Sequence, residues 1–143
     1  MRVSIRSTAG SAALAIALIL TACGGEAATI ELEPPATKVK IEGTDRYVVH
    51  VTEKAAERLD INTTEVTETE QGLAVPSAAV ILDPTGTFWV YVTDEPLAYY
   101  REEIGPVRQE DGWAYYTEGP ESGTTVVIEA VPELYGEETG VGK

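Results

Sequence analysis

The chain has 143 residues, with 10 Lys and Arg against 24 Asp and Glu and a formal net charge of −14. Nucleic-acid binding depends on neutralised phosphates and attraction to anionic lipid depends on cationic side chains, so this charge argues against both. The single cysteine leaves no pair for an internal disulfide, and a chain of this size can bury a usable core without one. We therefore expect one domain and no nucleic-acid partner.

The first 22 residues resemble an export signal. Arg2 and Arg6 precede an uncharged stretch, residues 9–20, that consists mostly of Ala, Leu and Ile. This run is shorter than the roughly 20 apolar residues that a helix needs to cross a bilayer core. A positive start, a short apolar middle and small residues before a boundary are typical of a signal peptide, which is removed on export. We expect residues 1–22 to be such a leader.

Cys23 follows this leader directly. The stretch "LTAC", residues 20–23, resembles the lipobox of bacterial lipoproteins, in which a peptidase cuts before a cysteine whose sulfur carries diacylglycerol. The alternative is a chance cysteine beside an ordinary signal. The resemblance implies acylation of Cys23 as the only modification, and two or more acyl chains would anchor the chain stably at the extracytoplasmic face of the cell membrane. The remaining charge is −16, because 8 Lys and Arg face 24 Asp and Glu once Arg2 and Arg6 are removed.

Composition divides the rest of the chain into three parts. Residues 23–37 contain "GGEAATIELEPPAT", a mixture of Gly, Ala, Glu and Pro without a period, which predicts a flexible linker. Residues 137–143 are rich in Gly and charge, which predicts a fraying tail. Residues 38–136 between them are expected to form a β-rich domain.

A strand and a short helix are expected at the start of this domain. "RYVVHV", residues 46–51, alternates side chains between two faces, as a strand does. His50 lies in this apolar strand and is expected to be a structural imidazole rather than a general base, although it could titrate. Thr52 is expected to cap a helix over "EKAAERL", residues 53–59.

The rest of the domain indicates consecutive β-strands. "TTEVTETE", residues 63–70, has little to bury and predicts an exposed or edge strand. Residues 78–82 and 87–92 are apolar and are separated by "DPTG", which suits a type I turn and predicts a central hairpin. Further strands are expected at residues 97–104, 113–117 and 124–131. This spacing predicts a mainly β fold, a small antiparallel β-barrel or roll with one short helix.

The sequence offers little material for catalysis or metal binding. Nucleophilic catalysis needs a nucleophile beside an oriented base, and neither a "GxSxG" serine nor a free thiol is present after processing. Soft metals draw on Cys, His and Met, which are scarce here. The pairs Glu102 with Glu103 and Glu110 with Asp111 could hold a hard cation through oxygen, but their spacing favours a solvated surface. We expect no enzyme and no resident metal.

Aromatic side chains are the most informative group. Neighbouring residues in a strand point to opposite faces, so Phe88 and Trp89, or Tyr115 and Tyr116, cannot all enter one core. Cross-strand packing explains most of the rings, and some ring remains for a partner. Because aromatic rings dominate interface energetics, we expect five of them to be candidate partner contacts, namely Trp89, Tyr91, Tyr99, Tyr100 and Trp113.

Four stretches also resemble one known family in their order along the chain. They are "ERLDINTTEV", "VPSAAVILDPTGTFWVYV", "YYREEI" and "TEGPESGTTVVIEAVPELYG", and they fall in about 85 residues from Lys54 onward. Together they are similar to the membrane-proximal, barrel-end part of the periplasmic adaptor subunits, the HlyD-like membrane fusion proteins, that serve efflux transporters. The resemblance implies a β-rich domain that binds and couples and has no catalytic residue.

The chain departs from this family in its first half. The adaptors carry a biotinyl-lipoyl-like domain and a long helical hairpin before the barrel, whereas only about 50 residues separate Cys23 from Val75 here, without heptads. We expect a membrane-anchored lipoprotein that acts as a non-enzymatic accessory of an inner-membrane efflux transporter. The alternative is a free-standing lipoprotein that binds a small ligand or a cation.

Overall fold

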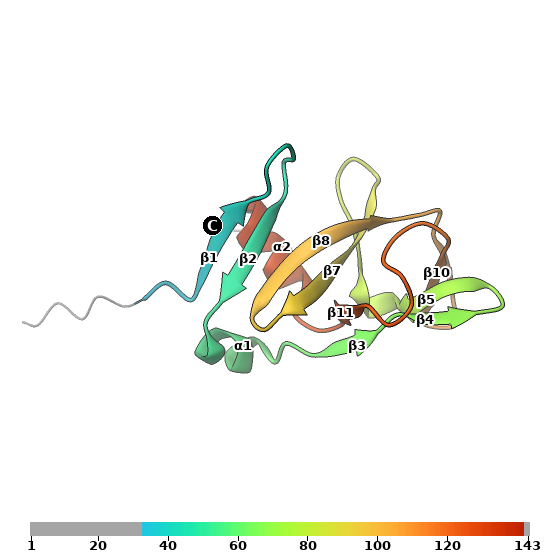
Figure 1. Ribbon diagram of the computed structural model, residues 1–143, viewed down its shortest axis with the longest axis horizontal. Helices are drawn as coiled ribbons and strands as arrows, with labels where there is room; N and C mark the ends of the chain where they lie inside the picture. Colours follow the sequence, from blue (N-terminus) through green and yellow to red (C-terminus); the bar gives the residue numbers. More distant parts are fainter. Residues whose placement is uncertain (1–32, 142–143) are drawn as a thin grey trace, which may run out of the picture. The chain divides into compact units, whose positions relative to one another are not determined.

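The computed structural model describes residues 33–141, which fold into two antiparallel sheets and two α-helices (Figure 1). The larger sheet has the strand order β1-β2-β8-β7-β11-β3, with β6 paired to β7, and the smaller one has the order β4-β5-β10-β9. The mainly β, antiparallel expectation is confirmed, and both described sheets are open rather than closed into a barrel. The strands are β1 (Ala36–Lys40), β2 (Tyr47–Val51), β3 (Thr63–Glu65), β4 (Thr67–Thr69), β5 (Gly72–Pro76), β6 (Val80–Leu82), β7 (Phe88–Glu95), β8 (Ala98–Ile104), β9 (Arg108–Glu110), β10 (Trp113–Tyr116) and β11 (Thr125–Val127).

The predicted hairpin consists of β6 and β7, of which β7 is an inner strand of the larger sheet and β6 lies off its main strand order. β6 pairs with β7, and Asp83 closes the turn between them because its backbone N–H donates to the Thr87 carbonyl at 3.0 Å. The Asp83 carboxylate also accepts from the backbone N–H groups of Thr85 and Thr87. Gly86 adopts a φ of 88°, a conformation that glycine reaches without the clash of a Cβ. The hairpin expectation is confirmed.

The first helix, α1 (Glu53–Leu59), also matches its prediction. The Thr52 side chain accepts a hydrogen bond from the Ala55 N–H at 3.2 Å, which satisfies one of the unpaired donors at the helix start. Ala55 turns toward the core, while Arg58 lies in the last turn of the helix. The helix therefore begins and ends within the predicted residues.

The structure also has a second helix, α2 (Val131–Thr139), which the sequence did not predict. The sequence suggested turns in this segment because it contains Pro132, Gly136 and Gly140. Proline is nevertheless tolerated in the first turn of a helix, and Gly140 ends this one in the left-handed region. Because α2 runs to Thr139 and buries Glu138, the predicted fraying tail over residues 137–143 was wrong for residues 137–139.

The strand expected over residues 124–131 is correspondingly shorter. Only Thr125–Val127 pairs in the sheet, as β11, and the chain then turns at Ala130, whose φ is 65°. A β pattern of apolar residues continues through this point, since Val131 is buried as well. Its burial comes from the first turn of α2 rather than from a strand.

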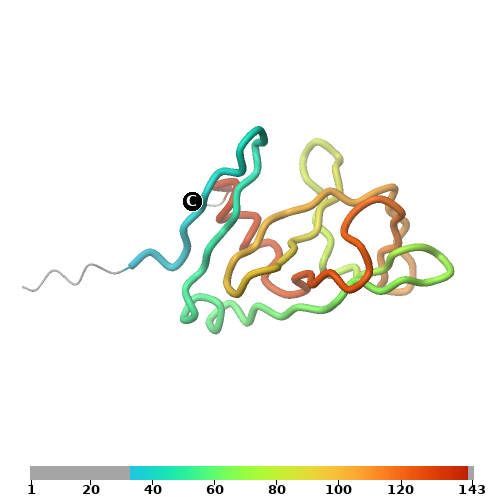
Figure 2. Tube along the Cα trace, in the orientation of Figure 1, coloured from blue at the N-terminus to red at the C-terminus, as the bar shows by residue number. Residues whose placement is uncertain are grey.

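The domain starts two residues earlier than predicted, because Ala36 and Thr37 belong to β1 and not to the linker. This strand pairs with β2 in the register Ala36↔Val51 to Lys40↔Tyr47. Its side chains are mostly exposed, so β1 shows no hydrophobic alternation. β9 is exposed at every residue and escaped prediction for the same reason. Figure 2 follows the chain from β1 to α2, which returns beside β2.

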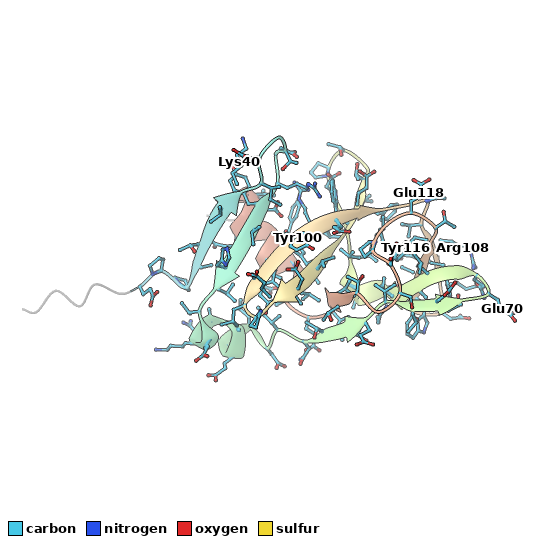
Figure 3. The ribbon with its side chains drawn as sticks, in the orientation of Figure 1. Lys40, Glu70, Tyr100, Arg108, Tyr116 and Glu118 are labelled. Carbon is cyan, nitrogen blue, oxygen red and sulfur yellow. The ribbon has the colours of Figure 1, made fainter. Side chains whose placement is uncertain are left out.

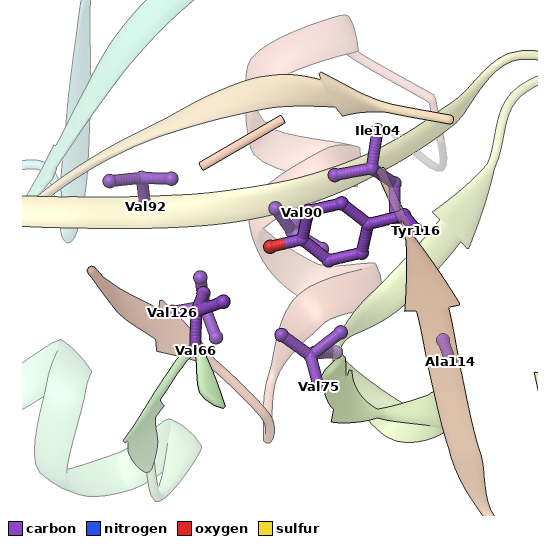
Figure 4. Close-up of a cluster of buried hydrophobic side chains, with 9 residues drawn as sticks. Val66, Val75, Val90, Val92, Ile104, Ala114, Tyr116 and Val126 are labelled. Carbon is purple, nitrogen blue, oxygen red and sulfur yellow. The ribbon is translucent and has the colours of Figure 1, made fainter. Parts of the chain in front are cut away.

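The core has two parts that lie on opposite faces of β7. Val90 and Val92 pack on one side against residues of the smaller sheet such as Val75 and Tyr116 (Figure 4). Tyr91, between them in the sequence, packs on the other side with Val49 and Leu134. β7 is therefore covered by the smaller sheet on one face and by α2 on the other, which explains why its sequence is apolar on both faces.

Candidate functional site

The structure places two of the five predicted contact residues in the core. Tyr91 is 0% exposed and Tyr99 is 6% exposed, so neither ring can meet a partner in this fold. Both prediction errors have the same cause. The sequence did not reveal α2, whose Leu134 lies in the same buried cluster as these two rings.

The hydroxyl of Tyr91 belongs to a buried polar network around Glu138. It donates to Glu138 Oε2 at 2.5 Å, while Glu138 Oε1 accepts from Arg101 Nε at 3.0 Å and from the Tyr47 backbone N–H at 3.1 Å. Burial raises the pKa of the Tyr91 hydroxyl well above its usual value, and the Glu138 carboxylate adds to this effect. The Glu138 carboxylate on α2 thus accepts hydrogen bonds from three strands of the larger sheet, β7, β8 and β2.

Trp89 is half-buried and is held by the same region of the sheet. Its indole N–H donates to Asp83 Oδ2 at 3.0 Å, and the Arg101 guanidinium lies 4.4 Å from its ring centroid. The Thr85 hydroxyl donates to Asp83 and is the main cause that holds the pKa of that carboxyl at about 2. These contacts make Trp89 a packing residue of the hairpin more than an open contact site.

Trp113 is the predicted contact residue that the structure leaves most open. It is 41% exposed, and its neighbours Ala114 and Tyr116 in β10 point inward. Tyr115 shares the outer face with Trp113, because alternate residues of a strand lie on one side. We call the surface formed by Trp113, Tyr115 and Arg108 the aromatic face.

Arg108 completes the aromatic face from the neighbouring strand. β9 pairs with β10 in a register that places Arg108 opposite Tyr115. The guanidinium lies 4.8 Å from the Tyr115 ring centroid, and it also contacts Glu110 and Gln71. Sequence reasoning did not select Tyr115 or Arg108, although the alternation around the buried Tyr116 was the signal that could have selected Tyr115. Figure 3 shows Arg108 on the smaller sheet, away from Lys40 at the end of β1.

Tyr100 lies away from the aromatic face, in an acidic cleft. The cleft has a volume of about 510 Å³ and is lined by Asp94, Glu102 and Glu121 among others. Burial raises the pKa of the Tyr100 hydroxyl, and the charges of Asp94 and Glu102 raise it further. Within residues 33–141, no group of three His, Cys, Asp or Glu residues could hold a metal ion. The cation-binding alternative stays a prediction.

His50 was expected to be a structural imidazole within an apolar strand, and the structure does not place it in such an environment. His50 is exposed, whereas Val49 and Val51 on either side of it are buried. Val49 and Val51 lie on the face of β2 that packs against the core. Side chains alternate between the two faces of a strand, so the imidazole of His50 points outward. His50 is not a structural core residue.

Cys23 and the leader that precedes it lie outside the described residues. In the part of the chain that the structure does describe, neither helix combines the length and the apolar character needed to span a membrane. No protein-family model, curated protein or solved structure matches the chain.

Proposed function

We propose that the chain is a membrane-anchored lipoprotein whose β domain is a non-enzymatic accessory of an inner-membrane transporter. Its anchor is an acylated Cys23 on the extracytoplasmic face, as the leader and the "LTAC" stretch indicate. The proposal is motivated by the family-like order of four stretches in the sequence. The observation that carries it is the aromatic face.

The aromatic face has the features of a protein contact. Trp, Tyr and Arg are the residue types that most often carry binding energy at interfaces, and all three occur here on adjacent strands. Trp113 leaves a large apolar ring in solvent, although inward packing would bury more apolar surface. A partner that covers this ring would recover that free energy.

The orientation of the face depends on the inner side of the same strand. Ala114 and Tyr116 are buried among Val75 and Val90, and the Tyr116 hydroxyl donates to the Pro120 carbonyl at 2.9 Å. These contacts fix β10 in the core, so Trp113 is presented on a rigid strand and not on a loop. A partner would then lose little conformational entropy from the domain on binding.

Capture of the partner from intact cells tests this proposal. A tagged, lipidated protein is crosslinked in the cell, purified and compared by mass spectrometry with the Trp113→Ala and Tyr115→Ala variants. We expect the unaltered protein to enrich one multi-span transporter and the two variants to lose it. Val39→Ala is the matched control, because Val39 is 57% exposed but lies on β1 of the other sheet.

The anchor has a separate test. A Cys23→Ala variant should move from the membrane fraction to the soluble extracytoplasmic fraction, because it cannot be acylated. The accessory role would be contradicted if the crosslinked, unaltered chain is anchored in the membrane but no membrane protein is purified with it. Membrane attachment of the Cys23→Ala variant would contradict the anchor instead.

A further inference from the structure

β3 forms an open edge of the larger sheet. The strand order ends at β3, and among residues 33–141 no strand pairs on its outer side. Its neighbour on the inner side is β11, in the register Thr63↔Val127 to Glu65↔Thr125. Figure 1 shows β3 at the lower margin of the fold, with β11 beside it. Such an edge presents backbone N–H and C=O groups to which another extended chain can add.

The backbone bonds on either side of β3 determine which of its groups point outward. The Asn62 carbonyl, before β3, accepts a hydrogen bond from the segment after β11 at 2.8 Å, and the Val66 N–H, after β3, donates one to the segment before β11 at 2.9 Å. In an antiparallel pair, residues that bond to the neighbouring strand alternate with residues whose backbone groups point away from it. Thr63 and Glu65 therefore direct their N–H and C=O groups outward, away from β11.

The sequence of this edge favours an extended chain. Residues 62–70, "NTTEVTETE", contain neither Gly nor Pro, and Thr has a high strand propensity. Val66 is 1% exposed and packs in the core with Val126, so the core fixes the chain between β3 and β4. Thr63 and Glu65 are exposed. The edge is therefore ordered without a partner, and the domain would lose little conformational entropy on binding one.

The charge along this edge is uniformly negative. Glu65, Glu68 and Glu70 are exposed, and residues 62–70 contain no Lys or Arg. The strands that pair with this segment, β11 and β5, carry no charged side chain, and the loop before β11 adds the exposed Glu121. An extended partner with basic side chains would therefore complement the edge.

Cations on the neighbouring elements are balanced by acids of those same elements. Helix α1, "EKAAERL", precedes the edge and contains as many acids as bases. Arg108 contacts Gln71 in the turn that follows the edge, and it forms an ion pair with Glu110 on its own strand. These elements therefore leave the acidic excess of the edge in place.

The geometry points to docking of an extended, lysine- or arginine-rich segment of a partner protein, which adds to the larger sheet as a further strand beside β3. Its backbone pairs with Thr63 and Glu65, and its basic side chains, at alternate positions, lie on the face of the sheet that carries Glu65. Strand addition takes affinity from main-chain hydrogen bonds and specificity from side chains. The inference does not rest on the accessory role proposed above, because β3 belongs to the larger sheet and the aromatic face to the smaller one.

Two synthetic peptides with blocked ends test the charge preference. KTKVKTK has basic side chains at alternate positions, and ETEVETE reverses their charge at the same length. Each is titrated into the full chain carrying Cys23→Ala, and binding is followed by amide NMR shifts and by hydrogen exchange at Thr63 and Glu65. We expect KTKVKTK to bind and to protect both amides, and ETEVETE to bind about tenfold more weakly or not at all.

N-methylated forms of KTKVKTK test the backbone pairing at constant charge. Residues that lie opposite each other and exchange hydrogen bonds have side chains on the same face, so the lysine backbone nitrogens of the probe face β3 and its threonine nitrogens face away. N-methylation of the inner lysine nitrogens should weaken binding by about tenfold, whereas N-methylation of the threonine nitrogens should change it by less than about twofold.

Variants of the chain locate the site. Glu65→Lys should weaken KTKVKTK binding by about fivefold or more, whereas Glu118→Lys, the same change of charge at an exposed position off this edge, should have an effect below about twofold. Thr63→Pro removes an outward N–H and should weaken binding as well. Amide NMR spectra without peptide show whether each variant is folded, and Glu65→Lys keeps the test decisive if Thr63→Pro does not fold.

Several results would overturn the inference. They are equal binding of KTKVKTK and ETEVETE, equal binding of the two N-methylated forms, and no binding of KTKVKTK at about 1 mM. Unchanged binding to folded Glu65→Lys would place the peptide on another surface. Self-association of the chain that KTKVKTK reverses would assign the edge to a second copy, whose β1 carries Lys38 and Lys40, in place of a partner protein.

Discussion

Glu138 is the residue on which the attachment of α2 most depends. It is 1% exposed and accepts hydrogen bonds from Arg101, Tyr91 and the backbone of Tyr47. A buried carboxylate is costly to desolvate, and these donors offset that cost. Its carboxylate joins α2 to β2, β7 and β8, which explains why residues 137–139, predicted to belong to a fraying tail, form the last turn of a helix.

Replacement of this carboxylate should therefore be severe. Glu138→Ala removes the carboxylate 3.0 Å from Arg101 Nε and leaves the buried guanidinium only Asp83 Oδ2, at 3.9 Å. We expect a loss of about 3 to 5 kcal/mol in the free energy of unfolding. Urea denaturation followed by fluorescence measures this value. The double variant Glu138→Leu with Arg101→Met should lose less than Glu138→Ala alone, because it removes the buried guanidinium together with its nearest carboxylate. An equal or larger loss in the double variant would contradict the assigned role.

The buried tyrosines predict an alkaline limit of stability. Burial, with a smaller effect of the Glu102 charge, raises the pKa of Tyr116 to about 12. In the unfolded chain a tyrosine ionises near pH 10, so the favourable contribution of Tyr116 is fully present below about pH 10 and is lost as the pH rises toward 12. Tyr91 shifts in the same direction. Urea unfolding at successive pH values from 9 to about 12 should show this decline, and Tyr116→Phe should make it shallower. Parallel curves for the two proteins would contradict the assignment.

At the scale of elements, α2 completes the second half of the core. Leu134 is 1% exposed and packs with Tyr91 and Val49. We expect Leu134→Ala to lower the free energy of unfolding by about 2 to 5 kcal/mol, since it opens a cavity beneath the helix. Val39→Ala, at an exposed position of β1, should change the value by less than about 0.5 kcal/mol. Thermal or urea denaturation of both variants makes the comparison, and a similar small effect for both would mean that α2 is dispensable.

The sequence predicted those elements whose pattern is local. Thr52, which can cap a helix, predicts the start of α1, and the "DPTG" turn between apolar residues predicts the β6–β7 hairpin. β1 and β9 are edge strands with exposed side chains, and their pairing comes from backbone hydrogen bonds that leave no trace in hydrophobicity. α2 was missed because its stability comes from Leu134 and Glu138 in contact with distant strands, which overrides the low helix propensity of Pro132 and Gly136.

The candidate site was predictable only in part for the same reason. Strand alternation correctly implied that one of Tyr115 and Tyr116 had to face outward, and Trp113 is open as expected. Tyr91 and Tyr99 were misassigned because both lie in the core cluster that α2 completes, and this helix could not be recognised. The contribution of Arg108 depends on the register of β9 with β10, a long-range feature that no local pattern contains.

At the scale of the whole molecule, the described domain carries two separate surfaces. The aromatic face lies on β9 and β10 of the smaller sheet, and a pocket lies among α1, α2, β1 and β2. Substitutions on one should leave the other unchanged, because distant sites contribute independently. Trp113→Ala should therefore lose the membrane partner while the fold around the pocket stays unchanged. Methyl NMR spectra of this variant, with signals of Val51 and Leu134 at the pocket, check that the fold there is unchanged.

Site-specific photo-crosslinking from the aromatic face tests the accessory role most directly. A benzoylphenylalanine side chain replaces Trp113 in the lipidated protein in intact cells, and a second protein carries it at Val39 on the other sheet. The proposal predicts that irradiation joins the position-113 protein to one multi-span transporter, with little or no such product from position 39. Absence of a membrane-protein adduct at position 113, or equal adducts from both positions, would contradict it.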